Sequence, residues 1–175
     1  MALRSPAPHE ILLPVKPAFI AFTLLVALLA NFLPWYGAAL WIKPDFLAVT
    51  LLYWCILQPR RLGFAAAWLL GLATDIGNAS LFGQHALAYT LLAYAGITLH
   101  RRVLQFGIAY QVLHVFPLLL LAQIAVLLVR MVAGADFPGF IFFAASATGA
   151  ALWPIMIVVF QLPQRTRLDP EQPAI

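Results

Sequence analysis

A chain of 175 residues that is 64% hydrophobic and only 9% charged has too little polar surface to cover a soluble globule. Its mean hydropathy of +0.95 indicates an integral membrane protein with one domain and no room for a separate soluble domain. The net charge of +4 does not indicate nucleic-acid binding, because the basic residues are scattered between apolar segments.

Six apolar segments follow one another along the chain, and we expect each to form a membrane-spanning helix. They run approximately over residues 17–33, 44–57, 62–77, 83–99, 106–132 and 137–162. The predicted fold is therefore all-α: a single bundle of six transmembrane helices over 17–162, with polar tails at 1–16 and 163–175. The first segment is longer than the apolar core of a signal peptide, so we interpret it as a retained anchor.

Small residues recur at a helical spacing in the third segment. Gly63, Ala67 and Gly71 are four residues apart, and Asp75 continues the series on the same helix face. Helices in lipid associate through close backbone approach over small residues, and an ionisable group in a spanning helix is turned toward a protein partner. We expect this stripe to pack at the centre of the bundle, with Asp75 at an inner polar position. The alternative is that Asp75 is an end residue near the lipid headgroups.

The basic residues predict how the bundle is oriented. Most fall on one side of the layout, and these are Arg4, Lys16, Arg60, Arg61, Arg101, Arg102, Arg165 and Arg167. Only Lys43 and Arg130 fall near the other side. Because cytoplasmic loops carry the excess of basic residues, we expect both termini to be cytoplasmic. Asp45, Asp75 and Asp136 lie toward the outer side, as do Asn31, Lys43, Gln84 and His85, which predicts that the polar chemistry is gathered there.

No pattern typical of catalysis or metal binding is present in the sequence. It contains no nucleotide-binding loop, no His-Glu-x-x-His, no Gly-x-Ser-x-Gly and no closely set group of metal ligands. We expect no catalytic residue, no metal and no cofactor. The single cysteine, Cys55, lies in an apolar segment and is interpreted as a packing residue. Asp75 and His85 are placed to meet across the short turn between the third and fourth helices, either as a structural pair or as a proton site.

A series of short motifs gives the chain a family resemblance. In chain order the motifs are Pro44-Asp45, Tyr53-Trp54, Gly71-x-x-x-Asp75, Leu81-Phe82-Gly83 and Trp153-Pro154. Together they resemble the bacterial rod shape-determining protein MreD family over nearly the whole chain, with Phe82-Gly83 where Leu-Gly is usual. The resemblance implies a non-enzymatic, multi-pass subunit of the inner-membrane machine that directs lateral peptidoglycan synthesis. It also implies a fold similar to the substrate-binding membrane subunits of energy-coupling-factor vitamin transporters.

The resemblance further implies an interaction scaffold with MreC as its direct partner. The actin-like MreB, the glycosyltransferase RodA and the associated transpeptidase would belong to the same complex, and no small-molecule substrate is expected. We expect helix packing at the small-residue stripe, and polar structural or partner-binding roles for Pro44, Asp45, Tyr53, Trp54, Asp75, Gly83 and His85. The alternative is a transporter subunit with an outward-facing pocket, surrounded by Asn31, Lys43, Asp45, Asp75 and His85.

The orientation can be tested with reporter fusions or cysteine labelling. Positions near Arg60, Arg101 and Arg165 should be cytoplasmic, and positions near Ala39, Ala79 and Ala135 should be outside, because of the distribution of basic residues. An external Arg101 would contradict the six-span layout.

Overall fold

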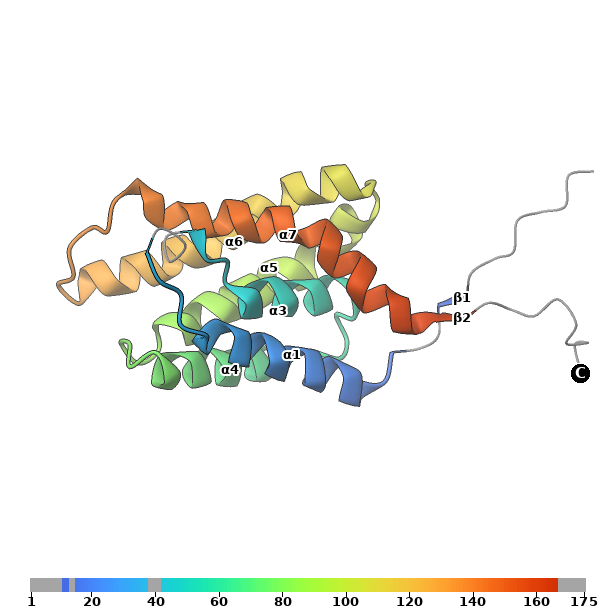
Figure 1. Ribbon diagram of the computed structural model, residues 1–175, viewed down its shortest axis with the longest axis horizontal. Coiled ribbons are helices and arrows are strands. Elements are labelled where there is room, and N and C mark those ends of the chain that lie inside the picture. The colour runs from blue at the N-terminus through green and yellow to red at the C-terminus, as the bar shows by residue number, and fades with distance from the viewer. Residues whose placement is uncertain (1–10, 13–14, 38–41, 167–175) are drawn as a thin grey trace, which may run out of the picture.

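The computed structural model describes residues 11–12, 15–37 and 42–166 and forms one elongated helical bundle (Figure 1). Its α-helices are α1 (Pro17–Phe32), α3 (Phe46–Leu57), α4 (Phe64–Gly77), α5 (Gln84–Leu104), α6 (Ile108–Val132) and α7 (Ala144–Gln161). Two 3₁₀ helices flank α7, η1 (Phe140–Phe143) before it and η2 (Leu162–Gln164) after it. The predicted helical bundle is thus confirmed for the described residues.

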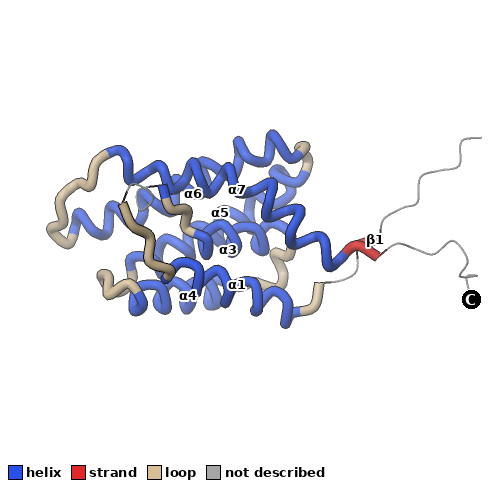
Figure 2. Tube along the Cα trace, in the orientation of Figure 1, coloured by secondary structure: helices blue, strands red, loops and turns tan. Residues whose placement is uncertain are grey.

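The two described ends of the chain pair with each other. The strand β1 (Ile11–Leu12) is antiparallel to β2 (Arg165–Thr166), an element that the sequence did not predict. We call this end of the bundle the strand end and the opposite end the polar end (Figures 1 and 2). Since β1 precedes α1 and β2 follows α7, both chain ends leave from the strand end. The predicted tail residues 1–10, 13–14 and 167–175 lie outside the described residues.

Helix α3 is the core of the bundle. Every residue from Leu47 to Ile56 is buried, and α3 contacts α1, α5, α6 and α7. A helix that is apolar on all faces is stable only when other protein elements surround it. The surrounding helices expose many large apolar side chains, including Leu69, Leu128 and Val132. The molecule therefore has an apolar core and an apolar outer surface, as expected of a protein in lipid.

Helix length differs widely within the bundle. By length and composition, α6 and the continuous stretch Phe140–Gln161 can cross a membrane, whereas α1, α3 and α4 are shorter apolar helices. Crossing a bilayer requires about 20 apolar residues. Because α3 is enclosed by protein, its 12 residues do not have to match the thickness of the bilayer.

Aromatic side chains fill the core between α1, α3 and α7. Trp54 stacks on Phe160 with ring centroids 5.7 Å apart, and its indole N–H donates a hydrogen bond to Thr23. Tyr53 packs against both Phe160 and Trp153. Tyr53 and Trp54 are completely buried. These two residues, for which we expected a polar structural or partner-binding role, are therefore not accessible to a partner, and the hydrogen bond from Trp54 to Thr23 is a polar structural contact within the core.

Several helix boundaries differ from the sequence-based prediction, and three of them have a clear physical reason. Helix α5 continues past residue 99 to Leu104. Arg101 and Arg102 lie in its last turn, where their positive charges are stabilised by the negative end of the helix dipole. The last α-helix begins only at Ala144, since a 3₁₀ turn follows Gly139, whose φ is +88°. Helix α3 begins at Phe46 with Asp45 as its N-cap, so Pro44 lies just outside the helix.

The small-residue stripe of α4 packs against α5 at only two of its glycine and alanine positions. Ala67 and Gly71 are buried, and a Cβ atom on Gly71 would lie 2.3 Å from the Ala86 Cα of α5. Gly63 is different, because it is the exposed N-cap of α4 and a Cβ atom there would have no neighbour within 4 Å. The prediction that Gly63 belongs to the packing stripe is therefore wrong, since the helix begins after it.

We expect Gly71→Ala to destabilise the protein more than Gly63→Ala, which adds no clash and changes only an exposed helix N-cap. The new methyl group on Gly71 meets backbone atoms, which cannot rotate away, and such overpacking costs about 1–3 kcal/mol. Gly71→Leu should be more damaging still. Thermal unfolding in mild detergent measures the effect, and equal midpoints for the two alanine variants would contradict the close α4–α5 contact.

Candidate functional site

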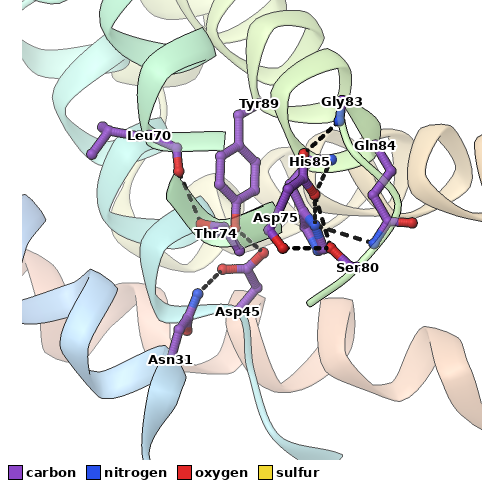
Figure 3. A network of polar contacts seen from close by, with 10 residues as sticks. All are labelled: Asn31, Asp45, Leu70, Thr74, Asp75, Ser80, Gly83, Gln84, His85 and Tyr89. Carbon is purple, nitrogen blue, oxygen red and sulfur yellow. Dashed lines mark hydrogen bonds and ion pairs between the residues drawn. The ribbon is translucent and has the colours of Figure 1, made fainter. Parts of the chain in front are cut away.

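A buried carboxylate joins α4 to α5 at the polar end (Figure 3). Asp75 is 0% exposed, and its Oδ2 accepts a hydrogen bond from the Gly83 N–H at 2.9 Å. Its Oδ1 accepts from the His85 N–H at 3.1 Å, the His85 Nδ1 at 2.7 Å and the Ser80 hydroxyl at 3.1 Å. Asp75 is therefore an inner polar group of the bundle, and it lies in the last turn of α4, at the end of that helix.

The Asp75 carboxylate caps α5 from a neighbouring helix. Gly83, the N-cap residue of α5, has no side chain with which to cap the first N–H groups of that helix. Its φ of +96° is a left-handed conformation that glycine adopts without strain. The backbone therefore turns tightly enough to aim the Gly83 and His85 N–H groups at Asp75. A negative charge is favoured there because it faces the positive end of the helix dipole.

A second carboxylate links three helices beside the first. Asp45 Oδ1 accepts hydrogen bonds from the Asn31 side chain at 2.7 Å and from the Ala48 N–H at 3.0 Å. Its Oδ2 accepts from the Tyr89 hydroxyl at 2.7 Å, and the Asn31 oxygen accepts from the Phe46 N–H at 2.9 Å. Asp45 thus caps its own helix α3 and holds α1 and α5 against it.

Lys43 extends this network to the C-terminus of α1. Its ammonium group donates to the carbonyl oxygens of Asn31 and Leu33, at the negative end of the α1 dipole. Burial lowers the pKa of Lys43, and the nearby Asp45 carboxylate partly offsets that effect.

Between these networks lies a cavity of about 230 Å³. All six α-helices or their ends contribute to its wall, and its floor is apolar. The polar residues that line it are Asn31, Lys43, Asp45, Thr74, Asn78, Gln84, His85, Gln123, Arg130 and Ser146. A second cavity of about 400 Å³ shares Asn78, Gln84, His85 and Arg130 with it. The polar end is therefore hollowed in the middle of the bundle.

The structure brings together most of the residues that the sequence singled out. Pro44, Asp45 and His85 line the cavity, whereas Asp75 and Gly83 lie behind His85 and are not in its wall. Of the pocket residues named for the transporter alternative, only Asp75 is absent from the wall. The contribution of α6 and α7 to the site was not predictable from the sequence, because their polar residues are isolated in apolar segments.

Polar residues of α6 and α7 complete the site. Gln123 donates to the Phe142 carbonyl oxygen at 2.9 Å and accepts from the Ser146 hydroxyl, so these groups fix the start of α7 against α6. Within residues 11–12, 15–37 and 42–166, no three His, Cys, Asp or Glu side chains are placed to hold a metal ion. The carboxylates are occupied by hydrogen bonds, so their chemistry is structural, and the cavity can act as a binding surface.

Both Asp75→Asn and Asp75→Leu should destabilise the protein. Each carboxylate oxygen accepts a backbone N–H, so the asparagine amide would point its N–H₂ at a donor in either orientation. One buried donor left without a partner costs about 1–3 kcal/mol, and leucine removes both acceptors. Thermal unfolding in detergent should therefore rank the wild type above Asp75→Asn and Asp75→Leu lowest. The exposed Asp136→Asn is the control, and wild-type stability of Asp75→Asn would contradict the capping role.

Comparisons with known proteins agree with the family resemblance. The family model for the rod shape-determining protein MreD matches residues 15–165. The curated rod shape-determining protein MreD of Haemophilus influenzae is 32% identical over 69 residues, which are 39% of this chain and 43% of that protein. The matched stretch thus spans less than half of that relative, and no solved structure matches the chain. Because the family model covers most of the chain and the structure is an apolar helical bundle, the chain belongs to the MreD family of bacterial rod shape-determining membrane proteins.

Proposed function

We propose that this protein is a non-enzymatic scaffold subunit of the cell-elongation complex in the bacterial inner membrane, with all six helices spanning the bilayer. In this proposal the strand end is cytoplasmic and the polar end faces outward. Three observations support it: the basic pairs at the strand end, the pairing of β1 with β2 there, and the apolar outer surface. The short α3 is compatible with this arrangement because protein encloses it.

The direct partner in this proposal is MreC, which would bind in the cavity of the polar end. Binding in the cavity is supported by its concave wall, to which all six helices contribute. Two carboxylates, Asp45 and Asp75, cap helix N-termini and hold these helices in place. A wall fixed in this way is organised before the partner arrives, so little ordering entropy is lost on binding. MreB, RodA and the elongation transpeptidase would join the same complex, with MreB on the cytoplasmic side.

The alternative function is a substrate-binding subunit of a vitamin-type transporter. The cavity with Asn31, Lys43, Asp45 and His85 in its wall is the feature that favours it. Its volume of about 230 Å³ is below the range of about 300–1,000 Å³ that is usual for small-molecule pockets, whereas the adjoining cavity of about 400 Å³ lies within that range. The first cavity by itself is better suited to one or two inserted side chains of a partner protein.

We expect Ala122→Phe to weaken the binding of MreC, because the phenyl ring fills the cavity. Ala122 is 5% exposed and lines the cavity, whereas its neighbour Leu121 is 41% exposed on the outside of the bundle. Leu121→Phe is therefore the matched control. Co-purification of MreC with the full-length chain in mild detergent, compared at equal protein level, is the measurement.

Thermal unfolding of the two variants shows whether each remains folded. Undiminished co-purification of MreC with a folded Ala122→Phe would contradict docking in the cavity. Native mass spectrometry of the purified wild type tests the alternative, because a bound small molecule that is lost in Ala122→Phe would favour the transporter function.

A further inference from the structure

Arg130 differs from the other cationic residues of the polar end. It lies in the last turn of α6, is half-buried and lines both cavities. Lys43 donates to the carbonyls that end α1, and His85 is paired with Asp75. In the part of the chain that the structure describes, no side-chain hydrogen bond or ion pair involves Arg130, and His85–Asp75 is the one ion pair found there. Its guanidinium group is therefore free to bind a ligand.

The acids near the cavity do not neutralise Arg130. Asp45, the one acidic residue in the wall, already accepts hydrogen bonds at both oxygens. Asp75 lies outside the wall and is occupied by α5. A partly desolvated charge without a partner is unfavourable. The cavity thus has a positive group without a side-chain partner among the described residues, with the Asn78 amide in the same stretch of wall.

We infer that Arg130 is the anchor for a carboxylate, supplied by an acidic residue on the outward-facing part of the partner protein. The inference rests on the proposed function and names the chemistry of the docking segment. A guanidinium presents a planar fork of N–H donors that matches a carboxylate in a bidentate pair. An apolar residue next to the acid would lie on the floor formed by Ala88, Leu119 and Val126.

The size and position of the cavity favour a protein side chain over a lipid phosphate. Arg130 lines a space between helices, and about 230 Å³ accommodates an acidic side chain with one apolar neighbour but not the acyl chains of a phospholipid. The phosphate of a lipid headgroup is the other anion that could reach Arg130, and the experiment below distinguishes it from a protein carboxylate.

The test measures the affinity of full-length MreC for the full-length chain carrying Arg130→Lys, Arg130→Gln or Arg130→Glu. We expect about tenfold or greater weakening for Arg130→Gln, a larger loss for Arg130→Glu and a partial loss for Arg130→Lys, which keeps the charge but not the fork. Thermal stability should fall only slightly, because Arg130 has no side-chain partner within the described part of the chain and its removal loses only a favourable charge at the C-terminus of α6. Arg102→Gln, an exposed change at the strand end, is the matched control.

A charge-reversed MreC, with one outward acid changed to lysine, should restore binding to Arg130→Glu. Wild-type affinity of Arg130→Glu would overturn the inference while the proposed function stands. Absence of MreC binding by the wild-type chain would contradict the proposed function itself and this inference with it. The same affinities are measured in nanodiscs of phosphatidylglycerol and of phosphatidylcholine. If Arg130→Gln weakens MreC binding in phosphatidylglycerol but not in phosphatidylcholine, the ligand of Arg130 is a lipid phosphate and the carboxylate assignment is overturned.

Discussion

The hydrogen bonds between the buried Asp75 carboxylate and the first N–H groups of α5 are the constraint on which the polar end depends. They satisfy partly buried N–H donors that have no partner within α5, and they place a negative charge at the positive end of that helix. They also fix where α5 begins relative to α4. The backbone contact between Gly71 and Ala86 lies in the next turn of the same two helices, so capping and close packing reinforce each other.

At the polar end of the bundle, four helix termini each have a charged side chain beside them. Asp45 and Asp75 lie at the N-termini of α3 and α5, whereas Lys43 and Arg130 lie at the C-termini of α1 and α6. Each charge has the sign that the dipole of the named helix favours, although Asp75 also lies in the last turn of α4. Three of the four are committed to contacts within the described residues, and Arg130 alone has none. This difference separates the groups that build the site from the group that is available to a ligand.

The shape of the site follows from the position of α3. A short helix that is buried on all sides leaves the longer α6 and α7 to extend beyond its N-terminus, and the cavity forms in the space above it. Such a cavity has an apolar floor and a polar rim because the helix interiors are apolar and the helix ends are polar. A binding role is consistent with a family that determines rod shape, since assembly of a complex requires organised surfaces rather than reacting groups.

The amino-acid sequence by itself determined the number of helices, their approximate bounds, and the concentration of polar groups at one end. Apolar segments and basic pairs carry that information locally, and the Asp75–His85 pair was also predictable because both residues flank one short turn. Only the tertiary structure decided that Gly63 is exposed, that Tyr53 and Trp54 are core residues, and that Arg130 faces the cavity. These properties depend on which face of each helix meets its neighbours. In a chain whose core and lipid-facing surface are equally apolar, residue type cannot distinguish the two faces, so packing alone decides.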